Sequence, residues 1–154
     1  MLPLDEFDKK LLRLLQQNNR LTTEELSNKV SLSQSAIQRR LTKLRNEKII
    51  EADVSIISPA AVGFGITSVV DVVLHEGNSK AIGLFKTEML KCPEVSQCYY
   101  VTGTYDFVLI VNTRDMHHYE EFQKFKLMDN PYLKHFYTHV VMDKVKMNYG
   151  QTII

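Results

Sequence analysis

The sequence predicts an α+β protein, with an N-terminal winged helix-turn-helix domain and a C-terminal βαββαβ domain of the ferredoxin-like type. Over the first fifty positions, apolar residues recur at three- and four-residue spacing, which is the periodicity of helices. After residue 65, runs rich in β-branched residues alternate with helical patterns. Pro59, Gly63 and Gly65 stand between these two regions, and we expect the domain boundary there.

Three helices are expected in the first fifty residues. The first covers residues 5–18, with Asp5 as its N-cap and one broad apolar face. The second begins at Thr22, which forms a capping box with Glu25 three residues later. A tight turn at residues 31–33 then leads to a longer helix over residues 34–47. Two helices joined in this way are the layout of a helix-turn-helix, whose last helix enters the DNA major groove.

The third helix carries the residues that we predict to contact DNA. Its apolar residues Ile37, Leu41 and Leu44 share one buried face, so the polar residues point away from the core. The predicted DNA-binding residues are Ser33, Gln34, Ser35, Gln38, Arg39, Arg40, Thr42 and Lys43. Arg and Gln can read guanine and adenine edges, whereas Arg40, Lys43 and Arg45 are better suited to phosphates. The alternative is a solvated charged face on a surface helix.

The charge of the chain is unevenly distributed. Residues 1–50 hold ten Lys and Arg against six Asp and Glu, a net charge of +4. Residues 51–154 hold nine against twelve, a net charge of −3. A basic first half suits contact with DNA phosphates, although chance scatter would also explain the difference.

The segment after the third helix, residues 49–57, has an extended pattern dominated by β-branched residues. It could form one strand of a wing, or a linker strand that leaves the domain. We therefore expect a DNA-binding domain over residues 1–50, a linker strand and hinge over residues 51–64, and a separate second domain over residues 65–154.

The remaining segments predict the order β-α-β-β-α-β. The expected strands cover residues 66–74, 95–102, 107–112 and 133–147, and the expected helices cover residues 79–91 and 116–128. A tight turn over residues 103–106 joins the two central strands. This order predicts an antiparallel sheet with both helices on one face.

Several other classes of protein are not supported by the sequence. No apolar run approaches the length of a membrane span, and the first residues do not resemble a signal peptide, so we expect a cytoplasmic protein without a membrane partner. We interpret Cys92 and Cys98 as reduced core residues. His117 and His118 point about 100° apart on a helix and cannot chelate one metal as a pair. No catalytic motif is present, so we expect neither an enzyme nor a cofactor.

The chain resembles the Lrp/AsnC regulators, the leucine-responsive or feast/famine family, over nearly its whole length. The resemblance rests on the opening LDEFDKKLLRLLQQNNRLTTEELSNKVSLSQSAIQRRLTKLRNEKII, on the turn VTGTYD and on the ending VVMDKVK. It implies a transcription regulator that binds double-stranded DNA and dimerises through its C-terminal domain. It also implies that residues 65–154 are a ligand-binding and oligomerisation domain, that dimers assemble further, often into octamers, and that a small amino-acid effector binds between dimers.

The resemblance also implies an effector site. The residues that correspond to the family's ligand cleft are Gly103, Thr104, Tyr105, Asp106, Thr138 and His139. Gly103 lets a ligand approach the backbone closely, and Asp106 is suited to pair with an α-ammonium group. The alternative is a plain hairpin turn in which Asp106 bonds its own backbone. Two positions depart from the family pattern: Lys48 replaces a common glycine, and His139 replaces a small hydroxyl residue.

Three functions follow from the sequence. The first is a sequence-specific transcription regulator whose assembly or DNA affinity responds to a small amino acid. The second is an effector-independent DNA-organising protein of the same fold, with a steep salt dependence. The third is an amino-acid-binding partner protein that uses its helix-turn-helix for protein contacts.

Overall fold

A computed structural model describes residues 3–75 and 79–154, and it divides the chain into two compact units. The first unit contains the described residues up to Ile56 together with Lys146–Ile154, and the second contains Ile57–Val145. The sequence prediction had assigned the last nine residues to the C-terminal domain. The α+β class and the order of the elements are as predicted.

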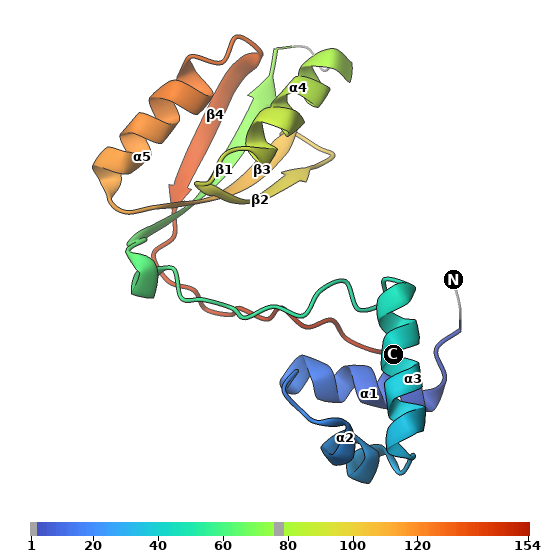
Figure 1. The fold of residues 1–154 in the computed structure, drawn as a ribbon. Coiled ribbons are helices and arrows are strands. Elements are labelled where there is room, and N and C mark those ends of the chain that lie inside the picture. Colours follow the sequence, from blue (N-terminus) through green and yellow to red (C-terminus); the bar gives the residue numbers. More distant parts are fainter. Residues whose placement is uncertain (1–2, 76–78) are drawn as a thin grey trace. The chain divides into compact units, whose positions relative to one another are not determined.

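The first unit is a bundle of three helices, α1 (Glu6–Gln17), α2 (Thr23–Val30) and α3 (Gln34–Asn46) (Figure 1). The predicted caps are confirmed, because Asp5 accepts the Asp8 N–H at 2.8 Å and Thr22 forms the reciprocal capping box with Glu25. Apolar side chains from the three helices form the core of this unit, which is built from Leu11, Leu26, Val30, Ile37 and Leu41. Its capped helices are thus held together mainly by burial of leucine and isoleucine.

Helix α3 ends in a left-handed residue although no glycine is present. Lys48 has a φ of 58°, its N–H donates to the Arg45 carbonyl at 3.1 Å, and the Ile49 N–H donates to the Leu44 carbonyl at 2.9 Å. This pair of hydrogen bonds is a Schellman motif with lysine at the position that usually holds glycine. The sequence analysis had noted the missing glycine, and the structure shows that the same cap forms without it.

Replacing Lys48 by glycine is expected to stabilise the DNA-binding unit. A side chain with a left-handed backbone destabilises the native state by roughly 1–2 kcal/mol, and glycine removes this cost. Glycine also makes the unfolded chain more flexible, which offsets part of the gain. We expect a net increase of about 0.5–1 kcal/mol in the free energy of unfolding, measured by urea denaturation. Lys48→Ala is the matched control, and it should give no comparable gain because alanine retains the Cβ.

The segment that follows α3 does not form a wing. Residues 49–65 are all described, and they contain no strand but only a short 3₁₀ turn, η1 (Ala60–Val62). Of the two alternatives left open by the sequence, the structure therefore supports an extended linker that leaves the helical unit. The left-handed Gly63, with a φ of 89°, ends η1 immediately before the second unit's sheet.

The C-terminal residues return to helix α1. Arg13 donates to the Ile153 carbonyl at 3.1 Å, and the Gln16 side chain donates to the Gln151 carbonyl at 3.1 Å. The Gln151 N–H donates back to the side-chain oxygen of Gln16. The expected long strand over residues 133–147 is wrong, because the strand ends at Val140 and the chain continues without regular structure.

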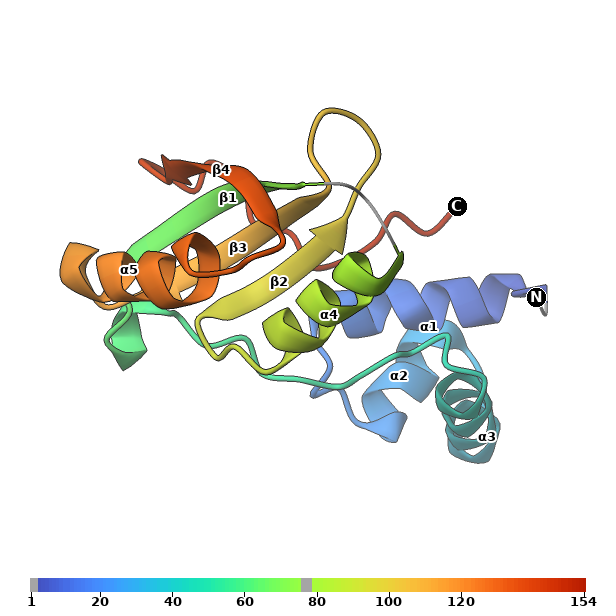
Figure 2. The same ribbon diagram turned by 90° about the horizontal axis from the view of Figure 1, so that it is seen from above.

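The second unit is a four-stranded antiparallel sheet covered by helices on one face (Figures 1 and 2). Its elements are β1 (Ile66–Leu74), α4 (Ser79–Leu90), β2 (Val95–Tyr100), β3 (Phe107–Thr113), α5 (Met116–Phe122), η2 (Gln123–Met128) and β4 (Leu133–Val140). The strand order is β2-β3-β1-β4, as expected for a βαββαβ domain. The helix expected over residues 116–128 changes at residue 123 from an α-helix to a π-helix, η2.

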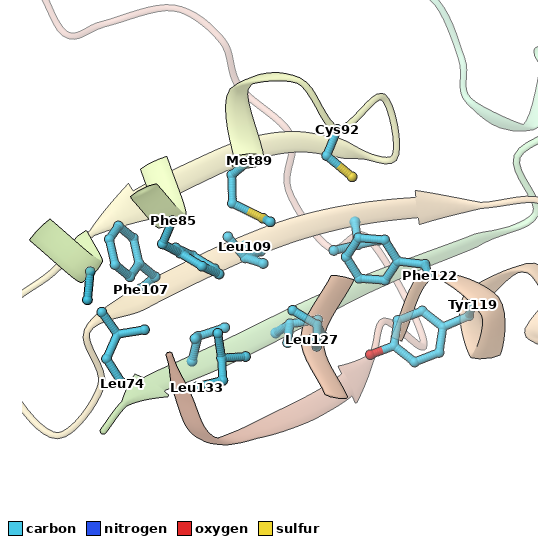
Figure 3. Close-up of a cluster of buried hydrophobic side chains, with 14 residues drawn as sticks. Leu74, Phe85, Met89, Cys92, Phe107, Leu109, Tyr119, Phe122, Leu127 and Leu133 are labelled. Atoms are coloured by element: carbon cyan, nitrogen blue, oxygen red, sulfur yellow. The ribbon is translucent and has the colours of Figure 1, made fainter. Parts of the chain in front are cut away.

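The core of the second unit lies between the sheet and the two helices (Figure 3). Phe85 of α4 and Phe107 of β3 are both fully buried, and their ring centroids lie 4.7 Å apart. Cys92 is buried as predicted, but the prediction for Cys98 is wrong because this residue is exposed. Its strand, β2, lies at one edge of the sheet, and residues 96–100 of this strand are all exposed. Both thiols are free.

Candidate DNA-binding and effector sites

Helix α3 presents a polar face to solvent, opposite its buried residues. Ile37, Leu41 and Leu44 are buried, as predicted. The exposed members of the predicted DNA-binding set are Ser33, Gln34, Ser35, Gln38, Arg39, Thr42 and Lys43. Ser33 also caps the helix by accepting the Ala36 N–H at 3.3 Å. The structure therefore brings seven of the eight residues to one accessible end and face of α3.

Arg40 is the exception within the predicted DNA-binding set. Its guanidinium lies 2.7 Å from both the Asp5 and the Asp8 carboxylates and 5.5 Å from the centre of the Phe7 ring. The hydrogen bonds that Arg40 donates to Asp8 and Asp5 raise the pKa of Arg40 above its ordinary value. Arg40 thus joins α3 to the start of α1, a contact that fixes the orientation of the recognition helix.

The other basic side chains of α3 differ in their partners. Arg45 is paired with Asp53 at 2.9 Å. Within the described part of the chain, no carboxylate lies within 4.0 Å of the Arg39 or Lys43 charge. Arg39 and Lys43 are therefore the cations of α3 that remain available to an anionic partner such as DNA.

The turn between β2 and β3 has the features expected of a close-approach site. Gly103 has a φ of 121°, and open space surrounds the position where a Cβ would stand. The Val101 N–H donates to the Asp106 carbonyl at 2.9 Å and closes the turn. The Asp106 carboxylate accepts the Leu74 N–H at 2.8 Å, so one of its oxygens already holds the end of β1. Its other oxygen has no hydrogen-bond donor among the described residues.

Thr138 and His139 lie on opposite faces of β4, because neighbouring side chains in a strand alternate. The Thr138 hydroxyl lies 2.5 Å from the Tyr119 hydroxyl on the helix side of the sheet. His139 lies 3.1 Å from the Asp71 carboxylate on the outer face. The six residues predicted to bind the effector therefore do not converge on one site within a single chain.

The outer face also contains residues that the sequence analysis missed. The Tyr105 and Tyr137 rings make an edge contact at 6.1 Å, and Tyr137 is 51% exposed. Tyr137 pairs directly with Asp71 of β1, next to the end that Asp106 caps. The two-residue periodicity of residues 133–140 was the available signal for Tyr137 and His139, since it places both on one face of the strand. Only the register of β1 and β4 adds Asp71 to them.

A three-helix helix-turn-helix unit with an accessible basic recognition helix, joined to a separate βαββαβ domain, defines a DNA-binding transcription regulator. Residues 4–45 match the model of the AsnC-type helix-turn-helix domain, and residues 67–151 match the model of the Lrp/AsnC ligand-binding domain. The chain therefore belongs to the Lrp/AsnC family of transcription regulators, a family of regulators rather than enzymes. No described helix is long and apolar enough to cross a membrane.

Relatives support this assignment over nearly the full length. An uncharacterised helix-turn-helix regulator of Sinorhizobium fredii is 48% identical over 150 residues, 97% of this chain and 89% of the relative. A proline dehydrogenase transcriptional activator of Rhizobium radiobacter is 32% identical over 93% of this chain and 92% of its own length. The crystal structure of a Neisseria meningitidis transcriptional regulator in complex with L-methionine has a TM-score of 0.92, with 30% identity and 97% coverage of both chains.

Proposed function

We propose that this regulator binds specific DNA sequences and that a small amino acid, bound beside the turn at residues 103–106, changes its assembly or DNA affinity. The observation that supports this most is the match of residues 67–151 to a ligand-binding domain, combined with an exposed turn whose Gly103 leaves room for a ligand. The Neisseria relative was solved with L-methionine, which makes methionine the first effector to test.

The proposed effector site is completed by a second copy of the chain. Asp106 has one carboxylate oxygen left for an ammonium group, and the turn has exposed amides for a carboxylate. Thr138 faces the helix layer and does not belong to this surface in one chain. We therefore propose that the effector contacts the turn from one dimer and further polar groups from another, as in an assembly of dimers.

The outer face of the sheet is the proposed dimer interface. Tyr99 and Tyr137 are each about half exposed there, and the outward valines of β1 lie between these strands. Contiguous exposed apolar side chains on a sheet face often mark a protein contact. Dimers and larger assemblies of dimers are in equilibrium. An effector that binds one of these forms more tightly than the other would shift this equilibrium toward the form that it prefers. In this proposal dimers assemble further, to octamers, in the cytoplasm.

The first experiment is a thermal-shift scan of the protein with each of the twenty amino acids at millimolar concentration. A ligand at one hundred times its dissociation constant stabilises the native state by about 2.7 kcal/mol, which raises the melting temperature by several degrees. We expect one or a few amino acids to give this shift. The alternative result is that no amino acid raises the melting temperature. If DNA binding also fell steeply with salt and showed little sequence preference, the protein would instead be a DNA-organising protein.

Asp106→Asn is the variant that tests the site itself. Asparagine retains an oxygen that can accept the Leu74 N–H, but it removes the charge that would pair with an ammonium group. Without effector, we expect the variant to have the melting temperature and the DNA affinity of the wild type. Its affinity for the effector should fall by at least about tenfold, which reduces the effector-induced rise in melting temperature. An undiminished shift would remove Asp106 from the site.

A separate outcome concerns the wild-type protein. If the wild type failed to bind any DNA at low salt, this would favour an amino-acid-binding partner protein.

A further inference from the structure

The last residues of the chain, Lys146–Ile154, belong to the compact unit that contains the three helices, although they follow the sheet of the second unit in the sequence. The chain therefore crosses between the two units twice, once after Ile56 and once after Val145. Around the second crossing, residues 142–149 are all exposed and form neither helix nor strand. The contacts that follow, at residues 150–153, therefore attach this C-terminal segment to the helical unit.

Gln16 of α1 is the centre of this attachment. Its side-chain amide binds the backbone of a single residue, Gln151, because the amide nitrogen donates to the Gln151 carbonyl and the amide oxygen accepts the Gln151 N–H. Three residues earlier, and on the same face of α1, Arg13 donates to the Ile153 carbonyl at 3.1 Å. The two contacts are about one helical turn apart on α1 and two residues apart in the segment, so the segment runs along the helix.

Gly150 lets the segment approach Gln16 closely. A Cβ at this position would lie 2.7 Å from the side-chain oxygen of Gln16 and 3.3 Å from that of Asn148. The Gly150 N–H also donates to the Asn148 oxygen at 2.9 Å, which fixes the backbone just before Gln151. Any side chain at residue 150 therefore displaces the amide of Gln16, an exposed group that can move without disturbing the core.

Helix α1 is also the helix to which the recognition helix is tied. At its start, Asp5 and Asp8 each lie 2.7 Å from the guanidinium of Arg40 on α3. Leu11 of α1 and Ile37 of α3 belong to the same buried core. A restraint on Gln16, near the other end of α1, therefore acts on the recognition helix as well.

We propose that the C-terminal segment is a second tether, which limits how far the DNA-binding unit can turn relative to the sheet domain, with Gln16 as its positioning residue. A unit joined through one extended linker can turn about many backbone bonds. A second connection, made to a different helix, closes a loop of the chain and removes much of this freedom. The tether thereby contributes to the specificity of DNA binding, because the orientation of two recognition helices sets the half-site spacing that they accept.

Half-site spacing reports this freedom in a dimer, on which this inference rests as part of the proposed function. Each added base pair moves a half-site by about 3.4 Å along the DNA and turns it by about 35° around the axis. DNA-binding units that cannot turn lose one of their two contacts when the spacing is wrong, and affinity then falls toward that for a single half-site. The inference requires the dimer but no effector.

The test measures binding of the full-length protein to DNA with two copies of a half-site that the wild type selects from random sequences. The copies are separated in one-base-pair steps over one helical turn. For the wild type, we expect affinities that differ by at least about tenfold between the best and the worst spacing. In Gln16→Ala and in Gly150→Ala, this difference should fall below about threefold, because the segment is released. Binding to a single half-site should be unchanged, since neither residue lies on α3.

Gln17→Ala is the matched control. Gln17 is the exposed neighbour of Gln16 on α1 and forms no hydrogen bond with the described residues of the segment, so this variant should keep the wild-type spacing profile. Gly150→Ala tests the same contact from the segment's side and leaves α1 unaltered. Arg13 is kept in all variants, because loss of a cation weakens contact with DNA phosphates by itself.

The outcomes separate the tether from the dimer. A wild-type spacing profile in both Gln16→Ala and Gly150→Ala would overturn the tether, and so would an equal loss of affinity on every fragment, including the single half-site, which a destabilised helix would produce. Sedimentation of the wild type gives its oligomeric state. A dimer without any spacing preference would overturn the tether alone, whereas a monomer would overturn the dimer of the proposed function and the tether with it.

Discussion

Replacing Phe85 by alanine is expected to cost the second unit about 3–5 kcal/mol of its free energy of unfolding. Phe85 is fully buried, and its ring lies 4.7 Å from that of Phe107, which also contacts Tyr100 at 5.1 Å. Removing the ring leaves a cavity between α4 and the sheet, which the surrounding strands can fill only partly. A loss of this size is a large share of the roughly 5–15 kcal/mol that stabilises a typical domain.

The effect should be confined to one unit, because the chain divides into two compact parts with separate cores. Urea denaturation followed by circular dichroism should show one transition moved to lower urea, while the transition of the helical unit stays in place. Leu90→Ala is the matched control on the same helix, since Leu90 is 88% exposed, and it should change stability by less than about 0.5 kcal/mol. Similar losses in the two variants would contradict the assigned core.

The elements that local sequence signals predict best are the helices of the first unit. The capping box of Thr22 and Glu25 and the N-cap of Asp5 are formed by residues three apart, so their chemistry is readable without knowing the fold. The alternation of apolar residues in β1 and β3 likewise follows from one-sided burial. These local rules were sufficient for the element order and the fold class.

Contacts between residues distant in the sequence were not predicted. Arg40 is paired with carboxylates 32 and 35 positions earlier, and residue 16 is hydrogen-bonded to residue 151. No spacing rule in a single sequence connects such positions. The π-helix at residues 123–128 was also not predicted, because the apolar spacing of residues 116–128 fits one continuous α-helix.

Thr138 and His139 are a different case. Their opposite orientations follow directly from the two-residue period of a strand, so the residues themselves argued against a shared cleft within one chain. The grouping came from family resemblance, which concerns an assembly of several chains. The strand geometry and the family resemblance agree only if these two residues serve different surfaces. Thr138 then lies inside the domain and His139 on its outer face.

Replacing Arg39 by alanine is expected to weaken binding to a specific DNA site by about 1–3 kcal/mol, the range for a base-contacting arginine. Arg39 is exposed on α3, and no carboxylate among the described residues is paired with it. The free energy of unfolding should therefore change by less than about 0.5 kcal/mol. A DNA fragment selected by the wild-type protein from random sequences, titrated at fixed salt in a gel-shift assay, provides the measurement.

Two companion variants separate base recognition from charge and from folding. Arg39→Lys retains the positive charge but lacks the rigid planar fork with which arginine contacts guanine, so specific binding should fall while non-specific binding stays close to that of the wild type. Arg40→Ala should instead lower the free energy of unfolding, because Asp5 and Asp8 lose the guanidinium that joins α3 to α1. If Arg39→Ala bound the selected site with wild-type affinity while Arg40→Ala lost it without destabilisation, the roles assigned to these neighbouring arginines would be reversed.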